Sequence, residues 1–174
     1  MDDEIRESIL SQIKVIDKAL ALERNAEIFY RRAAERTESE TGRSMFQWLA
    51  RFENSHQSRL MKKREELHKQ GMIAGTLPID TQLEISEADI RAEIREDISD
   101  VDVLRMAIEN ERRAIAYYEK KFTHAVDDSV GEMFRSMVND EERHIRILTD
   151  QLNSLTIDKI WTDLSALEKD IAEM

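Results

Sequence analysis

Two copies of the quartet Glu-x-x-His stand 88 residues apart in this chain, and each copy has another glutamate 30 residues upstream. In a helix, residues three positions apart lie on one face, so the glutamate and histidine of each quartet can point at the same metal ion. Two single carboxylates plus two such quartets form the inward ligand set of a two-metal site in a four-helix bundle. The six candidate ligands are Glu23, Glu53, His56, Glu111, Glu141 and His144.

A wider internal repeat surrounds these candidate ligands. The pattern Glu-Arg-x-Ala-x-x-x-Tyr begins at Glu23 and again at Glu111, so it places Tyr30 and Tyr118 two helical turns beyond them. A lone Glu-x-x-His arises by chance in many charged helices, whereas here both the spacing and the repeat would have to coincide. The same shift of 88 residues relates Val15 to Val103, Ala19 to Ala107, Met45 to Met133, Phe46 to Phe134 and Leu60 to Leu148.

Electrostatics favours metal ions over an empty polar core. Apolar residues flank the glutamates at helical spacing, as Leu20 and Ala26 flank Glu23, which places the carboxylates on the buried face. A buried charge is unfavourable unless it is paired or binds a metal, and two divalent cations would cancel four carboxylates. This mixture of carboxylates and imidazoles suits iron or manganese, because zinc takes fewer ligands and calcium prefers oxygen. The donor types leave the choice between iron and manganese open.

Three more side chains are candidates for contacts with the ligands. Metal-bound histidines usually donate their second N–H to a carboxylate or carbonyl, and we expect Asp140 to orient His56 in this way. Phe52 occupies the repeat position equivalent to Asp140, so His144 has no matching partner there. The two repeat tyrosines are expected to hydrogen-bond ligand carboxylates across the bundle. The alternatives are an exposed position for Asp140 and plain core positions for the tyrosines.

Composition and apolar periodicity predict the helices that position these residues. Hydrophobic residues make up 41% and charged residues 36%, with only four glycines and one proline, which suits long amphipathic helices better than sheets. Ser86 and Ser99 are each followed three residues later by an acid, as at helix starts. We therefore predict one all-α domain over residues 1–174, an antiparallel four-helix bundle. Its parts are a helical hairpin at about 8–70, a long crossover with a short helix at 71–98, a second hairpin at about 99–155 and a C-terminal helix at 156–172.

Charge and missing residue types exclude several classes of function. The net charge is -11 and the pI is about 4.9, so nucleic-acid binding, which needs a basic surface, is not expected. The absence of cysteine removes disulfides, zinc–thiolate sites and iron–sulfur clusters, and is compatible with a reducing cytoplasm. No stretch reaches the roughly 18 to 20 apolar residues of a membrane span, and the acidic start lacks the apolar run of a signal peptide. We therefore expect a cytoplasmic protein that does not bind membranes.

The repeated ligands, with the alanines and tyrosines around them, resemble the ferritin-like superfamily of di-iron carboxylate proteins, and most of all its rubrerythrin branch. The resemblance covers about residues 8–155. It implies a ferritin-like bundle in which the six candidate residues hold two iron ions, with manganese as the alternative metal. It also implies an oxidoreductase of peroxidase or ferroxidase type that uses hydrogen peroxide or oxygen in defence against oxidative stress. A separate protein would donate electrons, and we expect a homodimer or a larger homo-oligomer.

Two departures from the rubrerythrin pattern keep other functions open. Rubrerythrins carry a seventh glutamate three residues after the ligand of the third long helix, and Ala114 stands there in this sequence. Glu27, one turn after Glu23, is a candidate replacement. Rubrerythrins also usually carry a rubredoxin domain with four cysteines, and this sequence has none. The six-ligand set is also that of the bacterioferritins, so iron storage or delivery is the main alternative, ahead of a di-iron oxygenase and a metal-free structural bundle.

Overall fold

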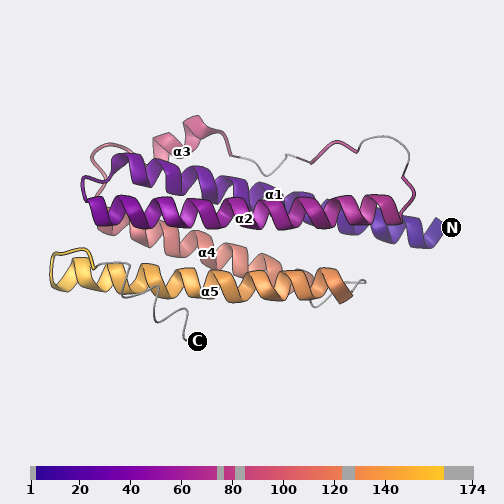
Figure 1. Ribbon diagram of the computed structural model, residues 1–174. Coiled ribbons are helices and arrows are strands. Elements are labelled where there is room, and N and C mark those ends of the chain that lie inside the picture. Colours follow the sequence, from indigo (N-terminus) through magenta and orange to yellow (C-terminus); the bar gives the residue numbers. More distant parts are fainter. Residues whose placement is uncertain (1–2, 74–76, 81–84, 123–127, 163–174) are drawn as a thin grey trace.

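The computed structural model describes residues 3–73, 77–80, 85–122 and 128–162, and its regular structure there is all α-helical. Four long helices lie side by side, and a short helix lies outside them (Figure 1). The predicted four-helix bundle with a long crossover between its hairpins is therefore confirmed. The helices are α1 (Asp3–Arg36), α2 (Glu40–Gln70), α3 (Glu87–Glu93), α4 (Asp100–Phe122) and α5 (Asp128–Ile157).

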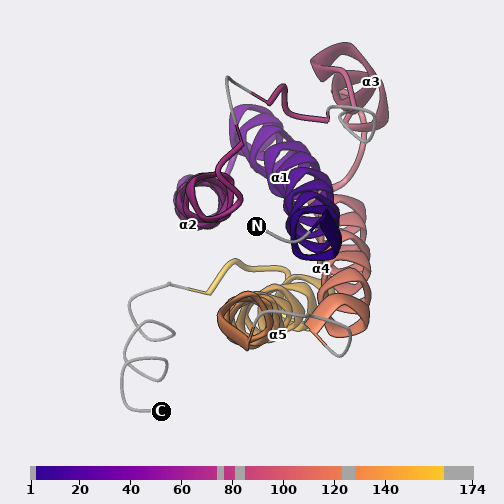
Figure 2. The same ribbon diagram turned by 90° about the vertical axis from the view of Figure 1, so that its right-hand side faces the viewer.

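The long helices form two antiparallel hairpins that pack against each other. Helix α1 packs mainly on α2, and α4 packs mainly on α5. Seen along the bundle, α1 also lies beside α4, and α2 lies beside α5 (Figure 2). Helix α4 begins at the end of the bundle where α1 stops, so these two repeat-related helices are antiparallel (Figure 1). An approximate twofold axis perpendicular to the bundle therefore relates the two halves of the repeat.

Serine side chains cap the first turns of α3 and α4. The hydroxyl of Ser86 accepts a hydrogen bond from the backbone N–H of Asp89 at 3.2 Å. Ser99 accepts one from the N–H of Asp102 at 3.1 Å. Such bonds satisfy N–H groups that have no partner within the first turn of a helix. Both helix starts predicted from these serines are confirmed.

Helix α3 lies on the outside of the bundle against α1 (Figure 2). Ile90 of this helix and Ile94, which directly follows it, are only 2% and 0% exposed. Just before this helix, the backbone N–H of Ile85 donates a hydrogen bond to the side chain of Asn25 on α1 at 2.8 Å. This part of the crossover is therefore attached to α1 by both apolar packing and a hydrogen bond.

A buried ion pair attaches the earlier part of the crossover to the first hairpin. Nε of Arg64 on α2 donates to Asp17 on α1 at 2.6 Å. The same guanidinium donates through Nη2 to the carbonyls of Leu77 at 3.0 Å and Pro78 at 3.1 Å. Asp17 in turn accepts a hydrogen bond from the backbone N–H of Asp80 at 3.2 Å. Two opposite charges thus fix residues 77–80 on the surface of the hairpin.

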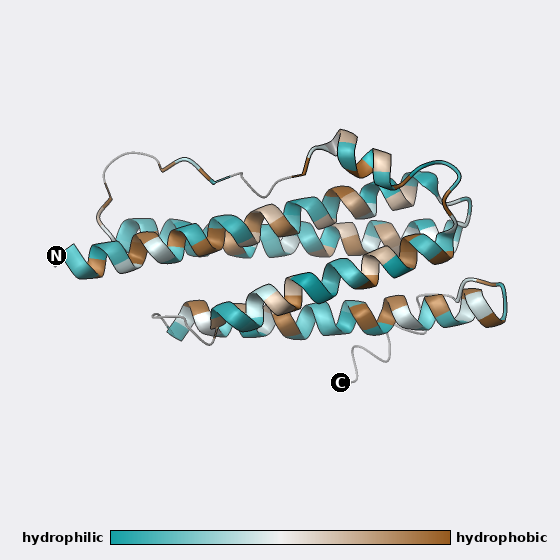
Figure 3. Cartoon of the chain, turned by 180° about the vertical axis from the view of Figure 1, so that it is seen from behind, coloured by the Kyte–Doolittle hydropathy of each residue, from teal (hydrophilic) through white to brown (hydrophobic). Residues whose placement is uncertain are grey.

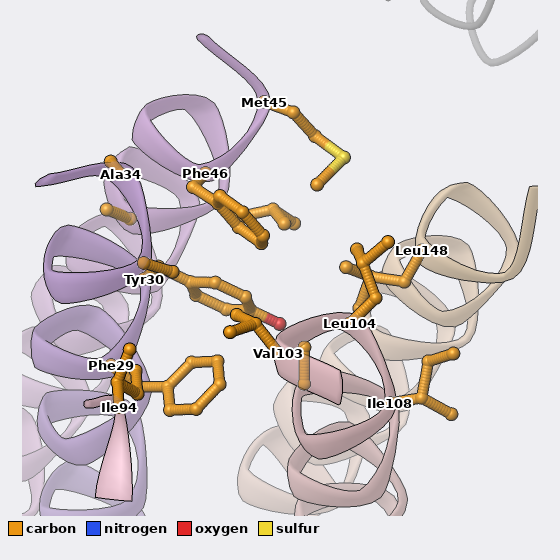
Figure 4. Close-up of a cluster of buried hydrophobic side chains, with 14 of the residues drawn as sticks. Phe29, Tyr30, Ala34, Met45, Phe46, Ile94, Val103, Leu104, Ile108 and Leu148 are labelled. Carbon is orange, nitrogen blue, oxygen red and sulfur yellow. The ribbon is translucent and has the colours of Figure 1, made fainter. Parts of the chain in front are cut away.

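Two apolar clusters fill the bundle toward its two ends. The first packs Tyr30 and Phe46 of the first hairpin against Leu104 and Leu148 of the second (Figure 4). The second gathers residues from the opposite ends of the same four helices, among them Phe134. Hydrophilic and hydrophobic residues alternate along each long helix, as in amphipathic helices (Figure 3). No helix in the described part of the chain combines the length and apolar character that a membrane span requires.

The chain turns back after α5. Residues 156–157, predicted to open a separate C-terminal helix, are instead the last residues of α5. The helix ends there because Lys159 has a positive φ of 61°. The turn brings Trp161 back onto the core, where its ring packs edge-on against Phe46 with 5.9 Å between ring centres. Residues 158–162 also belong to the predicted helix, but they form a turn and an irregular segment instead. Residues 163–172 of the predicted helix lie outside the described residues.

Candidate metal centre

Each of the four long helices places ligand-type side chains at the centre of the bundle, between the two apolar clusters. Helices α1 and α4 contribute one glutamate each, and α2 and α5 contribute one Glu-x-x-His quartet each. The six side chains are at most 2% exposed. The structure therefore brings together all six residues predicted as ligands: Glu23, Glu53, His56, Glu111, Glu141 and His144.

These side chains form two overlapping groups of potential metal ligands. Within each group, one ligand atom from every residue lies within 4.8 Å of the others. Glu53 and Glu141 belong to both groups, and a carboxylate has two oxygens with which to contact two ions. The bundle thus provides two adjacent sites with two carboxylates in common. The first group is Glu23, Glu53, His56 and Glu141, and the second is Glu53, Glu111, Glu141 and His144.

One ring nitrogen of each histidine points into the cluster. Nδ1 of His56 lies 2.9 Å from Oε2 of Glu23 and 3.1 Å from Oε1 of Glu141. Nδ1 of His144 lies 2.8 Å from Oε2 of Glu141 and 3.4 Å from Oε1 of Glu53. Nδ1 is therefore the candidate metal-binding atom of both histidines.

The outer nitrogens of the two histidines have different surroundings. Nε2 of His56 lies 3.4 Å from Oδ2 of Asp140, and the same oxygen lies 3.3 Å from the guanidinium of Arg59. The contact predicted between Asp140 and His56 is thus present. The ring of Phe52 stands edge-on to His144, with 5.1 Å between ring centres. Within the described structure, Nε2 of His144 has no hydrogen-bond partner.

Two tyrosines connect the hairpins at the cluster. Tyr30 of α1 donates a hydrogen bond to Glu111 of α4, and Tyr118 of α4 donates one to Glu23 of α1. The hydroxyl of Tyr30 is directed away from its own hairpin toward the second one (Figure 4). Both tyrosines are almost completely buried. The predicted contacts of the tyrosines with ligand carboxylates are therefore observed, one on each unshared glutamate.

A family model for rubrerythrin matches residues 14–152, which contain the whole cluster. The chain belongs to the rubrerythrin family. Among solved structures, a hypothetical protein from Pyrococcus furiosus is similar to it, with a TM-score of 0.67 and 20% sequence identity over 83% of this chain and 90% of that one. At this identity the likeness concerns the fold alone. No curated protein matches the chain.

In this member of the rubrerythrin family, Glu27 does not take the place of the glutamate missing at Ala114. Its carboxylate contacts Gln57 of α2 at 2.7 Å and Arg31 at 2.5 Å. Neither ligand group found among the described residues includes it. No sequence pattern singles out Gln57, because an isolated glutamine on a charged helix has no distinctive spacing. This protein therefore has six candidate metal ligands, and Glu27 is not one of them.

Burial dominates the acidity of the cluster. Burial, followed by repulsion from Glu53 and Glu141, raises the pKa of Glu23 well above its usual value. Burial and the same two neighbours raise the pKa of Glu111 to about 8. Burial alone would also raise the pKa of Glu53, but its contacts with the two histidines outweigh burial and lower it. Without cations, the cluster therefore retains protons on its unshared glutamates.

The donor atoms fit two divalent cations. Oε1 of Glu53, both carboxylate oxygens of Glu141 and both ring nitrogens of His144 are buried, and within the described structure they have no aligned hydrogen-bond partner. Buried polar atoms without partners are unfavourable, and metal ions would supply the missing interactions. Two divalent cations would also cancel the charge of the four carboxylates. Carboxylates combined with imidazoles suit iron or manganese.

Proposed function

We propose that this protein binds two iron ions and reduces hydrogen peroxide or oxygen with them, as a peroxidase or ferroxidase that limits oxidative stress. The observation that carries the proposal is the pair of overlapping ligand groups that share Glu53 and Glu141. Shared carboxylates would hold two ions side by side, close enough for both to act on one small molecule. Iron supplies the electrons, one from each Fe(II) ion as it becomes Fe(III).

The two ligand groups suggest how the residues would be divided between two ions. Glu23 and His56 would serve one ion, and Glu111 and His144 would serve the other. Glu53 and Glu141 would serve both. Tyr118 donates to Oε1 of Glu23, whose Oε2 lies beside His56. Tyr30 donates to Oε1 of Glu111. The two hairpins thus supply three ligands each.

The protein's own residues also control protons at the site. Burial, and then the charge of Glu111, raises the pKa of Tyr30, so its hydroxyl keeps the proton that it donates to Glu111. Partial burial would raise the pKa of Asp140, but the contact with His56 and the nearby arginines lower it. Asp140 is therefore ionised and holds the proton of His56 on Nε2, which leaves Nδ1 free to bind metal.

Anaerobic loading with two Fe(II) ions per chain, followed by hydrogen peroxide, tests this proposal. We expect oxidation of both ions by one equivalent of peroxide and the appearance of an oxo-bridged ferric absorption. The variant His56→Ala should lose this response, whereas His68→Ala, on the same helix outside the cluster, should retain it. Persistence of Fe(II) after peroxide in the unmodified protein would contradict the proposal.

Iron storage or delivery is the second candidate function, because Ala114 leaves the six-ligand set without a seventh glutamate. The two functions differ in the fate of the iron after Fe(II) has been oxidised. In storage, a large homo-oligomeric shell would retain many ferric ions per chain. In the first proposal, a homodimer or small homo-oligomer would keep two ions per chain, and a separate donor protein would reduce them again. Native mass and iron content after repeated Fe(II) additions distinguish the two.

A further inference from the structure

A pocket of about 140 Å³ lies beside the cluster, between α1, α4 and the residues of the crossover around α3. Its lining includes repeat-related pairs, among them Glu23 with Glu111 and Ala26 with Ala114. The pocket therefore lies near the approximate twofold axis, between the two unshared ligands. Ala114, where other rubrerythrins carry the seventh glutamate, is part of its wall.

The polarity of the pocket changes along its depth. The carboxylates of Glu23, Glu53 and Glu111, each at most 2% exposed, form the inner end. Phe29 and Ile90, 3% and 2% exposed, belong to an apolar wall together with the two alanines. The exposed residues of the lining, such as Arg113, mark the opening to solvent. A molecule that fits these surfaces has a polar head and a short apolar body.

The volume selects the size of that molecule. A water molecule occupies about 30 Å³ of liquid, and an engineered apolar cavity of about 150 Å³ holds benzene. Hydrogen peroxide, with two heavy atoms, would leave most of this pocket without contacts. A body of about four to six carbon atoms fills it.

The charge balance selects a neutral molecule. Two divalent ions cancel the four carboxylates of the cluster, so the inner end offers no net positive charge to an anion. Transferring a charged group into a largely apolar pocket is unfavourable, whereas a neutral head loses less hydration. Long-chain acids and phosphorylated compounds are therefore poor candidates.

We infer that the pocket binds a short-chain organic hydroperoxide, with its O–O group toward Glu23, Glu53 and Glu111 and its carbon chain against the apolar wall. This inference rests on the proposed peroxide-reducing function and names its substrate class. The O–O bond breaks, and two Fe(II) ions are oxidised to Fe(III) as they supply the two electrons. With two protons taken up, the carbon-bearing oxygen leaves as an alcohol and the other oxygen leaves as water.

A binding experiment on the metal-free chain tests the pocket without any turnover. The probe is tert-butanol, the alcohol formed from tert-butyl hydroperoxide, added to protein with isotope-labelled alanine methyl groups. We expect saturable shifts of the Ala26 and Ala114 methyl signals and none for Ala116, which is exposed on the same helix as Ala114. The variant Ala114→Leu should abolish the response at Ala26. Absence of saturable shifts in the unmodified protein would overturn the inference.

A kinetic experiment on the iron-loaded chain measures specificity. The quantity is the ratio of kcat/KM for tert-butyl hydroperoxide to kcat/KM for hydrogen peroxide. A side chain that fills the pocket should lower this ratio at least about tenfold, the usual effect of steric misfit in a small apolar pocket. Ala114→Leu is the test variant, Ala116→Leu the matched control, and Ala26→Leu a second test variant should Ala114→Leu fail to fold.

The outcomes separate this inference from the function on which it rests. An unchanged ratio in folded Ala114→Leu and Ala26→Leu would overturn the inference. Oxidation of Fe(II) by hydrogen peroxide but not by the organic peroxide would also overturn it, while leaving the proposed function intact. Failure of both peroxides to oxidise Fe(II) would instead contradict the proposed function.

Discussion

The two histidines occupy equivalent positions in the repeat, yet they face different chemistry on their outer sides. Nε2 of His56 faces the carboxylate of Asp140 at 3.4 Å, whereas His144 meets the edge-on ring of Phe52. Positions 52 and 140 are themselves repeat-equivalent, so the change of residue type between them contributes directly to the difference in surroundings. A carboxylate behind a histidine fixes its tautomer and raises its basicity. The cluster is therefore symmetric in its ligands and asymmetric in the residues that support them.

The two hairpins also differ away from the cluster. The buried pair of Asp17 and Arg64 attaches the crossover to the first hairpin. The repeat-equivalent positions in the second hairpin are Arg105 and Leu152, which cannot form the same pair. The pair belongs to the connection, since its two side chains also bind backbone groups of residues 77–80. The two halves thus have the same residues at the ligand positions and different residues where the first hairpin contacts the crossover.

We expect the largest effect, on metal binding, from substitutions in the ligand cluster that the two halves form together. Glu53→Ala and Glu141→Ala each remove a residue common to both ligand groups, so we expect both ions to be lost. The affinity for each ion should fall by more than the about 10- to 100-fold that is typical when a hydrogen-bond partner of a ligand is removed. Glu23→Ala should remove one ion and leave the second. Metal analysis after gel filtration measures both results, with the exposed neighbour Glu142→Ala as the control. Retention of two ions in Glu53→Ala would refute the assignment of shared ligands.

Removing the crossover attachment tests the second difference. Arg64→Met leaves Asp17 buried without its partner, so we expect a loss of about 3 to 5 kcal/mol in the free energy of unfolding. Leu152→Met, at the equivalent place in the second hairpin, should change little because no ion pair is lost there. Denaturant unfolding of both variants in the metal-free state gives the comparison. Equal losses in the two would show that the ion pair does not distinguish the hairpins.

The pH dependence of the metal-free protein tests the unshared ligands. The pKa of Glu111 rises from 4.5 to about 8 on folding, so its contribution to stability is complete below pH 4.5 and is lost as the pH rises toward 8. The raised pKa of Glu23 acts with the same sign. Between pH 5 and 8 we expect a loss of about 3 kcal/mol, or on the order of 10 °C in Tm. Glu111→Gln should flatten this slope, and Glu109→Gln, exposed on the same helix, should not.

Metal ions should remove this pH dependence, since they displace the protons from the cluster. Thermal unfolding of the loaded protein across the same pH range is the matching measurement. A Tm of the metal-free protein that rises from pH 5 to pH 8 would contradict the sign derived for both glutamates.

The smallest expected effect concerns the two histidines directly. Asp140→Asn weakens the support of His56, so we expect about tenfold weaker binding of one ion and no change for the other. Phe52→Asn offers His144 an acceptor and should bring the two affinities closer together. Anaerobic titration calorimetry with Fe(II) resolves the two steps. Equal weakening of both steps by Asp140→Asn would argue against inequivalent sites.

The helices and the candidate ligands could be predicted because both depend on spacing along the chain. The i and i+3 spacing of Glu53 and His56 survives folding unchanged, and Ser99 marks a helix start by purely local chemistry. The contact between Asp140 and His56 could be predicted by comparing the two halves of the repeat. In each case the relevant geometry follows from the spacing of residues along the chain.

Other features depend on distances between helices, and these distances cannot be derived from the spacing of residues along the chain. The sharing of Glu53 and Glu141 depends on how closely α2 and α5 approach. The turn of Glu27 away from the cluster depends on Gln57, across the interface between α1 and α2. The sequence does not predict that α5 continues to residue 157. The usual signal for the end of a helix is a glycine, whereas here Lys159 adopts the positive φ.

The contacts of Tyr30 with Glu111 and of Tyr118 with Glu23 join residues 81 and 95 positions apart. Each hairpin can form early from local contacts, whereas these links require both hairpins to dock. Since each hairpin carries only three of the six ligands, neither binds the ions in the geometry seen here before docking occurs. Bound ions would then hold the two hairpins together, and separating the hairpins would require release of the ions. Ion loading should therefore slow the unfolding rate as well as stabilise the native state at equilibrium.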